Sequence, residues 1–188
     1  MSETETATLA GGCFWCIEAA FKELEGVLEA TSGYAGGHVE DPSYKAVCSG
    51  STGHAEVVQI EYDPDLLDYE DLLEVFFRIH DPTTKDRQGP DRGSQYRSAV
   101  YYHDEEQKRT VERFVHNLQQ GGSFESYEND DIVTEIAPLE RFWEAEQRHQ
   151  DYYDKNPTDR YCQFHAEPKV KKVREQFADK ATVSGGSS

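Results

Sequence analysis

A cysteine that directly follows two glycines, in Gly11-Gly12-Cys13, is the feature that most constrains the fold of this chain. Residues 7–10 before it are mostly apolar and predict a short strand. Residues 14–24 after it carry apolar side chains at spacings of three and four, which predicts a helix. Glycine permits the sharp turn that joins a strand directly to a helix. The sequence therefore places Cys13 at or near the N-terminus of a helix that follows a strand.

The rest of the chain alternates between strand and helix patterns. The 188 residues are enough for one well-packed domain, 1–188, and no linker rich in proline, glycine or serine divides them. We expect an α/β (α+β) two-layer sandwich, in which helices pack against one sheet. Further strands are predicted at residues 27–34, 54–62, 96–102 and 132–137, and helices from Asp68, from Asp104 to about Leu118, near 143–155 and near 170–178.

The chain is strongly acidic, with 37 Asp and Glu against 19 Lys and Arg and a net charge of −18. Such a charge repels nucleic acid and anionic membranes, so we expect neither as a partner, and it is typical of proteins from halophiles. No apolar run approaches the roughly 18 residues of a membrane span, and the acidic N-terminus is unlike a secretory signal. We expect a cytoplasmic protein whose four cysteines are catalytic or metal-binding rather than disulfide-bonded.

The position of Cys13 favours a reactive thiol. Unpaired N–H groups and the positive end of the helix dipole stabilise a thiolate, which lowers the cysteine pKa below its free value of about 8.5. Cys16 lies one helical turn further on and completes a C-x-x-C pair, which is typical of redox sites. The alternatives are a small buried apolar residue or half of a zinc site. Because Cys48 and Cys162 stand alone and no closely spaced histidine pair occurs, we expect no metal.

Short motifs continue along the chain in a fixed order: Gly12-Cys13-Phe14-Trp15-Cys16, Gly33-Tyr34-Ala35-Gly36-Gly37, Asp41-Pro42-Ser43-Tyr44, Val47-Cys48-Ser49-Gly50, Thr52-Gly53-His54-Ala55-Glu56, His80-Asp81-Pro82, Asp91-Arg92-Gly93-Ser94-Gln95-Tyr96-Arg97-Ser98, His149-Gln150 and Lys155-Asn156-Pro157. Together they resemble the signature of the peptide methionine-S-sulfoxide reductases, the MsrA family. The resemblance covers about residues 6–165, and a C-terminal helix is expected at about 169–180.

The resemblance implies a fold and an activity. The family fold is a two-layer sandwich around a mixed central sheet, which agrees with the alternation of predicted elements. The family reduces methionine-S-sulfoxide, free or in proteins, to methionine, and so repairs oxidative damage. We therefore expect an oxidoreductase with no bound cofactor, thioredoxin or another dithiol as reductant, oxidised methionine as substrate and a monomeric state.

The resemblance also implies roles for individual residues. Glu56 can act as an acid near neutral pH only if burial raises its pKa. Taken alone, a glutamate in a predicted strand is more often an exposed carboxylate. The implied roles are Cys13 as nucleophile, Glu56 as the acid facing the sulfoxide oxygen, Tyr44 and Tyr96 as hydroxyls that bind this oxygen, Asp91 as support from behind, and Phe14 and Trp15 as walls of the methyl pocket.

The sequence leaves open which thiol completes the cycle. Attack by Cys13 releases methionine and leaves a sulfenic acid, which condenses with a second thiol to a disulfide. Cys162 occupies the position of the family's first recycling cysteine, although the glycine-rich tail with a further cysteine is absent after it. Cys16 is the alternative, because helix geometry keeps it close to Cys13. Positional match slightly favours Cys162, and Cys48 is expected to be structural.

Two other functions compete with sulfoxide reduction. A general thiol–disulfide oxidoreductase would use Cys13 and Cys16 without the tyrosines and the glutamate, and it would reduce insulin but no sulfoxide. A non-enzymatic zinc or interaction module would bind metal stoichiometrically. The ordered motifs favour the reductase over both. His54 and His149, which lie in motif segments, are expected to hold the site by hydrogen bonds rather than to bind metal.

Overall fold

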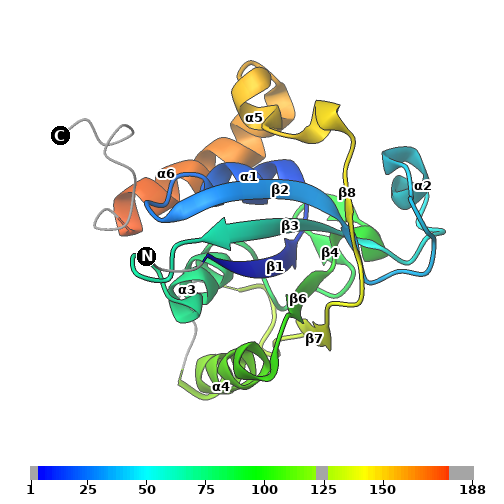
Figure 1. Cartoon of the computed structure of the whole chain (residues 1–188). Coiled ribbons are helices and arrows are strands. Elements are labelled where there is room, and N and C mark those ends of the chain that lie inside the picture. The colour runs from blue at the N-terminus through cyan, green and yellow to red at the C-terminus, as the bar shows by residue number, and fades with distance from the viewer. Residues whose placement is uncertain (1–3, 122–126, 178–188) are drawn as a thin grey trace.

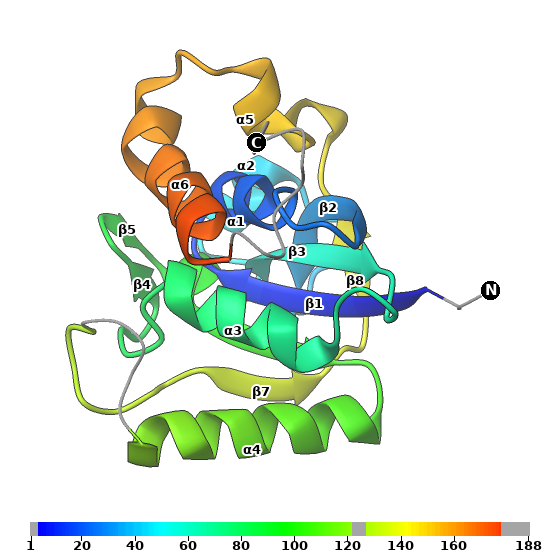
Figure 2. The ribbon, with the colours of Figure 1, turned by 90° about the vertical axis from the view of Figure 1, so that its left-hand side faces the viewer.

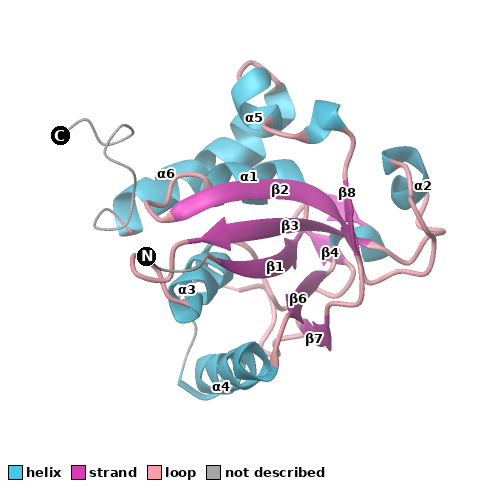
Figure 3. Ribbon diagram, viewed as in Figure 1, coloured by secondary structure: helices cyan, strands magenta, loops and turns pink. Residues whose placement is uncertain are grey.

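A six-stranded mixed sheet forms the centre of the computed structural model, which describes residues 4–121 and 127–177 (Figures 1 and 3). The strand order is β7-β6-β1-β3-β2-β8, with β6 and β7 parallel and the other neighbours antiparallel. A small separate sheet pairs β4 with β5. The strands are β1 (Glu5–Gly11), β2 (Val27–Ala35), β3 (Ala55–Tyr62), β4 (Arg87–Gln88), β5 (Asp91–Arg92), β6 (Ser98–Tyr102), β7 (Glu135–Pro138) and β8 (Phe142–Glu144).

Helices cover one face of the sheet and build the main core with it. Four of them, α1, α3, α4 and α6, contribute apolar side chains to one cluster. Figure 2 shows α1, α3 and α6 together beside β1. Strand residues alternate between this cluster and a smaller one on the opposite face. This arrangement confirms the predicted sandwich with a mixed sheet. The helices are α1 (Phe14–Phe21), α2 (Tyr44–Cys48), α3 (Tyr69–Ile79), α4 (Glu105–Gly121), α5 (Tyr152–Lys155) and α6 (Glu167–Gln176).

The central position of β1 explains its apolar sequence. Leu9 on β1 pairs with Val58 on β3 and with Val100 on β6, and all three side chains are fully buried in the main core. Ala7 and Leu9 of β1 face the main core and Ala10 faces the smaller cluster, so small and apolar residues occupy both faces of this strand. Because β1 is held on every side, its last residue, Gly11, fixes where the following helix begins.

The predicted helix near residues 143–155 is wrong. Residues 142–144 form β8, in which Trp143 pairs with Tyr34 at the edge of the sheet. A short 3₁₀ turn at Gln147–His149 follows, and only Tyr152–Lys155 is α-helical. Asp151 lies between them with φ +55°, a left-handed conformation that interrupts any helix. Tertiary contacts of this segment outweigh its local helix propensity.

Other element boundaries differ by smaller amounts. Residues Ser94–Tyr96 form a 3₁₀ turn, so β6 begins only at Ser98, and β7 begins at Glu135 rather than 132. The C-terminal helix α6 begins at Glu167 after a π-helical turn at Cys162–Ala166, and residues 178–180 of its predicted range lie outside the described residues. No helix within the described ranges is long and apolar enough to cross a membrane.

Candidate active site

Cys13 is the N-cap residue of α1, as the sequence predicts. Its carbonyl accepts hydrogen bonds from the N–H groups of Cys16 (3.1 Å) and Ile17 (3.4 Å). Gly12 before it has φ +100°, and a Cβ at this position would lie 2.7 Å from Cγ of Gln88. Two constraints therefore require glycine at position 12: the positive φ of the backbone and the close packing of the Gln88 side chain from β4.

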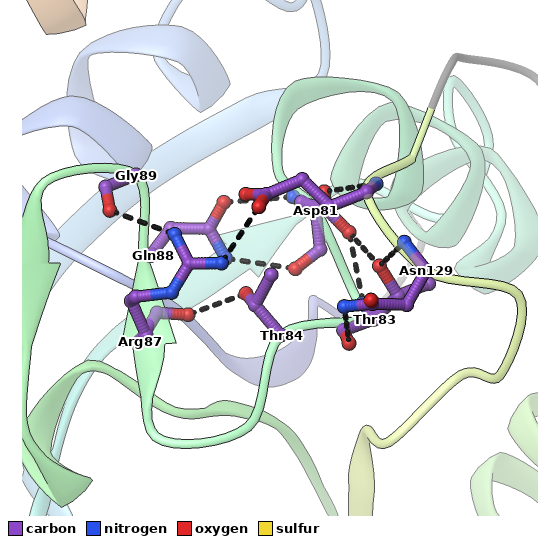
Figure 4. Close-up of polar contacts among 8 residues, drawn as sticks. Asp81, Thr83, Thr84, Arg87, Gln88, Gly89 and Asn129 are labelled. Carbon is purple, nitrogen blue, oxygen red and sulfur yellow. Dashed lines mark hydrogen bonds and ion pairs between the residues drawn. The ribbon is translucent and has the colours of Figure 1, made fainter.

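The β4–β5 hairpin that supplies Gln88 is fixed by a local polar network (Figure 4). The Asp81 N–H donates to Gln88 Oε1, and Gln88 Nε2 donates back to the Asp81 carbonyl, both at 2.8 Å. Thr84 Oγ1 donates to the Arg87 carbonyl at 2.6 Å. This network keeps the hairpin against Gly12 and also positions Asp91 on β5.

Glu56 lies on β3 beneath the start of α1. Its side chain is 1% exposed; Oε1 accepts the Phe14 N–H at 3.1 Å, and Oε2 has no hydrogen-bond partner in the described residues. Burial raises the pKa of Glu56 to about 8, with Asp91 and Cys16 adding to the rise, although the hydrogen bond from Phe14 opposes it. The carboxyl therefore carries a proton at neutral pH, as the sequence analysis requires of an acid.

Tyr44 and Tyr96 approach Glu56 from two other elements. Tyr44 is the first residue of α2, and Tyr96 ends the 3₁₀ turn before β6. Burial, followed by the charge of Glu56, raises the pKa of both phenols, so both keep their protons. The half-buried Cys48 thiol lies within hydrogen-bond reach of both hydroxyls, and burial raises its pKa. Cys48 is thus closer to the reacting groups than a purely structural residue needs to be.

Aromatic rings cover the side of the site next to Cys13. The Trp15 ring stacks on Tyr152 with centroids 3.7 Å apart, and Trp15 Nε1 donates to Nδ1 of His149 at 3.1 Å. Tyr44 packs on His149 at 4.2 Å. Phe14 is fully buried against the same rings, so Trp15, which is partly exposed, presents the accessible surface. The predicted hydrogen-bonding role of His149 is confirmed.

His54 has a similar holding role. Its Nδ1 accepts the Gly37 N–H at 3.0 Å, and its Nε2 lies 2.7 Å from the Val39 carbonyl. These bonds tie the segment before β3 to the loop that follows β2, which confirms the structural role predicted for His54.

Three cysteines gather in one apolar cluster. Cys13, Cys16 and Cys162 are 9%, 2% and 0% exposed and pack together with side chains of α1 and α6. The Cys13 thiol lies within hydrogen-bond reach of the Cys16 sulfur. The structure thus brings together both candidate recycling thiols with the nucleophile.

The pKa of the Cys13 thiol runs against the expectation from its helix position. Burial, together with the hydrogen bond and charge of Cys16, raises the pKa of Cys13 well above its usual value, whereas the hydrogen bond from Cys13 lowers that of Cys16. Desolvation outweighs the helix dipole at this depth. Within the pair, Cys16 is therefore the thiol that ionises more readily.

Asp91 supports the site through Tyr161. The Tyr161 hydroxyl donates to Asp91 Oδ2 and also lies within hydrogen-bond reach of Cys16. Asp91 therefore lies behind the thiols, where it is bonded to Tyr161, and its supporting role in the reaction stays a prediction. Tyr161 was not identified from the sequence, because nothing distinguishes it there from the other ten tyrosines.

Two further carboxyl groups were missed in the sequence. Glu146 accepts hydrogen bonds from the Tyr34 hydroxyl and the Tyr44 N–H, both at 2.9 Å, and so fixes α2 beside the site. Glu18, 2% exposed on α1, accepts the Asp151 N–H at 3.0 and 3.1 Å, and burial raises its pKa to about 7.

Within residues 4–121 and 127–177, no group of three or more metal-ligating side chains occurs.

Comparison with known proteins gives one consistent result. A family model described as peptide methionine sulfoxide reductase matches residues 5–181. The peptide methionine sulfoxide reductase MsrA of the halophile Natronomonas pharaonis is 62% identical over 177 residues, 94% of this chain and 97% of that protein, which confirms the halophilic character inferred from charge. Among solved structures, reduced Mxr1 from Saccharomyces cerevisiae has a TM-score of 0.78 at 36% identity and covers 87% of this chain and 91% of its own.

A second solved structure contains a partner. Mxr1 from Saccharomyces cerevisiae in complex with Trx2 has a TM-score of 0.54 at 26% identity and covers 80% of this chain and 85% of its own. Because the family model spans nearly the whole sequence and the archaeal relative is so similar over almost its full length, the chain belongs to the peptide methionine sulfoxide reductases of the MsrA type, a family of oxidoreductases.

Proposed function

We propose that this protein reduces the S epimer of methionine sulfoxide, free or within proteins, to methionine, and so repairs oxidative damage. The observation that carries the proposal is Glu56, a buried carboxyl held by the Phe14 N–H with Oε2 free of partners beside the nucleophile. With a pKa of about 8, this carboxyl holds a proton for the sulfoxide oxygen at neutral pH.

The first step transfers oxygen from substrate to enzyme. The Cys13 sulfur attacks the sulfoxide sulfur while the oxygen is hydrogen-bonded by Glu56, Tyr44 and Tyr96, which stabilises the charge that develops on it. The attack forms a sulfur–sulfur bond. The oxygen, protonated by Glu56, then moves from the substrate sulfur to the Cys13 sulfur as the sulfur–oxygen bond of the substrate and the sulfur–sulfur bond break, which releases methionine and leaves Cys13 as a sulfenic acid. The methionine sulfur gains two electrons, and the Cys13 sulfur loses them.

Three contacts with different chemistry favour one epimer. The substrate sulfur faces Cys13, its oxygen faces Glu56 and the tyrosines, and its methyl group rests on the aromatic wall formed by Trp15 with Phe14 behind it. The sulfoxide sulfur is chiral, so these three contacts fit a single hand, and the resemblance of the sequence motifs to the methionine-S-sulfoxide reductases favours S.

Recycling begins, in our proposal, with Cys16. Cys16 already lies within hydrogen-bond reach of Cys13, whereas the charges that act on Cys162 are those of Asp159 and Cys16. The Cys13 sulfenic acid and Cys16 form a disulfide and release water. Cys162 then attacks Cys16, which frees Cys13 and moves the disulfide to Cys16 and Cys162. This order departs from the slight preference for Cys162 as the first acceptor and makes Cys162 the second.

Thioredoxin, or another dithiol, reduces the final disulfide in this proposal. The complex of yeast Mxr1 with Trx2 supports a thioredoxin partner. A cytoplasmic location, a monomeric state and the absence of a bound cofactor stay predictions.

The decisive experiment uses separated sulfoxide epimers of blocked methionine with dithiothreitol as reductant. We expect the wild-type protein to consume the S epimer alone. Cys13→Ser should be inactive with an unchanged melting temperature, because a hydroxyl is far less nucleophilic than a thiolate. Equal rates on both epimers, or normal turnover by Cys13→Ser, would overturn the proposal.

A further inference from the structure

Lys169 on α6 is a lysine without a carboxylate partner. It forms no ion pair and no hydrogen bond in the part of the chain that the structure describes, although the protein has 37 acidic residues for 19 basic ones. By contrast, Lys22 forms ion pairs with Asp151 and Asp154, and Lys171, which lies on α6 like Lys169, forms an ion pair with Glu167. In so acidic a chain, an unpaired lysine beside buried groups calls for another kind of counter-charge.

The packing of α6 directs this lysine toward the thiols. α6 lies along α1 (Figures 1 and 2), and its residue Val170 belongs to the same buried cluster as Cys13, Cys16 and Cys162. Lys169 follows Ala166 by three positions and precedes Val170, and both of these residues belong to the cluster, so Lys169 lies at the edge of the same face of the helix. Its charge acts on Cys16, Cys13 and Asp91. Burial lowers the pKa of Lys169, but the thiolate of Cys16 opposes this effect and favours the ammonium.

The charges around the thiol pair otherwise disfavour a thiolate. Asp91 adds negative charge, Glu56 does so once it ionises above about pH 8, and burial penalises any ion. His80 also lies near Lys169, but burial lowers its pKa to about 4, so it is neutral at pH 7. Of the titratable groups that face the pair, Lys169 is the cation; the groups are Glu56 on β3, Asp91 on β5, Tyr96 before β6, Tyr152 on α5, and Tyr161, Cys162 and Lys169 around the start of α6.

We propose that Lys169 is a positioning residue whose ammonium is the counter-ion of the single thiolate shared by Cys13 and Cys16. The helix α6 therefore supplies a charge to the site as well as an apolar cover. An opposite charge within roughly 4–6 Å shifts such an equilibrium by about 1–3 pH units toward the ion.

The shared thiolate serves two successive steps, and this part rests on the proposed function. As Cys13 attacks the sulfoxide, its proton passes along the hydrogen bond to the Cys16 sulfur. After oxygen transfer, Cys16 loses this proton to water and attacks the Cys13 sulfenic acid as a thiolate. Hydroxide leaves and is protonated to water, so one disulfide and one water are formed.

The test measures thiol reactivity rather than turnover. The reduced full chain is alkylated with iodoacetamide from pH 5 to 10, and peptide mass spectrometry follows modification of Cys13 and Cys16 separately. For Lys169→Met we expect the midpoint of the combined reaction to rise by at least about one pH unit, with a loss of about tenfold in rate below the midpoint. Lys169→Arg should keep the wild-type profile because it keeps the charge.

Lys171→Met is the matched control, since it removes an exposed charge from the same helix and pairs only with Glu167. A Lys169→Met profile that superposes on those of the wild type and Lys171→Met would overturn the proposal. Should Lys169→Met fail to fold, Lys169→Gln is subject to the same criterion. The assay needs no sulfoxide, so a wild-type protein that reduces none would refute the proposed function while this comparison still stands.

Discussion

At the scale of single residues, the buried carboxyl of Glu56 and the partly buried carboxyl of Glu146, both near Tyr44, differ in protonation because their partners differ. Glu56 accepts one hydrogen bond, and burial raises its pKa to about 8. For Glu146, burial acts in the same direction, but the Tyr44 N–H and the Tyr34 hydroxyl outweigh it and lower the pKa. The opposite pKa shifts of the two carboxyl groups indicate different roles. Glu56 can donate a proton, whereas Glu146 stays ionised and holds α2 in place.

The Glu56→Gln variant tests the proton donor. Glutamine keeps the shape and the bond from Phe14 but has no transferable proton. We expect kcat to fall by about 10²- to 10⁴-fold, the usual contribution of a positioned general acid. In the wild type, the rate should decline above about pH 8 as Glu56 ionises. Steady-state turnover of the S epimer at a series of pH values measures both effects.

The pH dependence of protein stability tests the raised pKa of Glu56 independently of the reaction rate. The folded pKa of Glu56, about 8, exceeds its ordinary value of 4.5, so its contribution to stability is complete below pH 4.5 and disappears as pH rises through 8. Glu56→Gln should therefore gain stability relative to the wild type over this range, by an amount on the order of a few kcal/mol. A near-normal rate with no such gain would remove Glu56 from the mechanism.

The sequence could identify residues within motifs but not those that act alone. Cys13, Glu56, Tyr44, Tyr96 and Asp91 stand in recognisable segments, and the structure brings them together. Solitary charged or phenolic residues, such as Glu146, Lys169 and Tyr161, have no local signature. Their roles depend on burial and on partners far away in the chain, and neither can be read from neighbouring residues.

At the scale of elements, the first turn of α1 decides the order of disulfides. Oxidation of Cys162→Ser with one equivalent of sulfoxide should still form the Cys13–Cys16 bridge at the wild-type rate, because Cys16 needs almost no loop closure. Cys16→Ser should form a Cys13–Cys162 bridge more slowly or stop at the sulfenic acid. Peptide mass mapping after rapid acid quenching distinguishes these products. A bridge lost only in Cys162→Ser would instead make Cys162 the first acceptor, as positional match alone favoured.

The segment between β8 and α5 shows why local propensity failed there. The Gln150 side chain forms hydrogen bonds with the edge of β2 as a neighbouring strand would. Its Oε1 accepts the Ser32 N–H at 2.9 Å, and its Nε2 donates to the carbonyls of Ser32 and Ala145 at 2.9 and 3.1 Å. A helix through this segment would lose these bonds and leave buried groups of Ser32 unpaired. The contacts join residues 118 positions apart, beyond any local pattern.

Gln150→Ala should therefore destabilise the protein strongly for a single polar substitution. Each buried group left unpaired costs about 1–3 kcal/mol, so we expect a loss of about 2–4 kcal/mol and a melting temperature lower by about 5–15 °C. Gln163→Ala is the control, because Gln163 is exposed and makes one long bond to the Pro157 carbonyl. Equal melting temperatures for the two variants would show that Gln150 does not hold this segment.

At the scale of the whole molecule, the acidic excess is confined largely to the surface, and among the described residues only two acidic side chains, Glu18 and Glu56, are buried. Exposed carboxylates outnumber their basic partners, so the net charge of −18 creates long-range repulsion that burial elsewhere must offset. Salt shortens the range of this repulsion from about 10 Å at 0.1 M to about 3 Å at 1 M. Short-range packing in the core is hardly affected by the same change.

Potassium chloride should therefore raise the melting temperature. Between 0.1 and 1 M salt we expect a rise of about 2–8 °C, which corresponds to about 1–2 kcal/mol for a chain of this length. The matched variant replaces by glutamine four exposed glutamates that make no ion pair with any residue that the structure describes, Glu25, Glu112, Glu140 and Glu175, so that its net charge becomes −18 plus 4, or −14. Because less repulsion remains to be screened, this variant should melt higher than the wild type at low salt and respond less to added salt. Differential scanning calorimetry of both proteins across the salt series makes the comparison. Parallel salt profiles for the two proteins would show that the stabilisation by salt does not arise from screening of this negative charge.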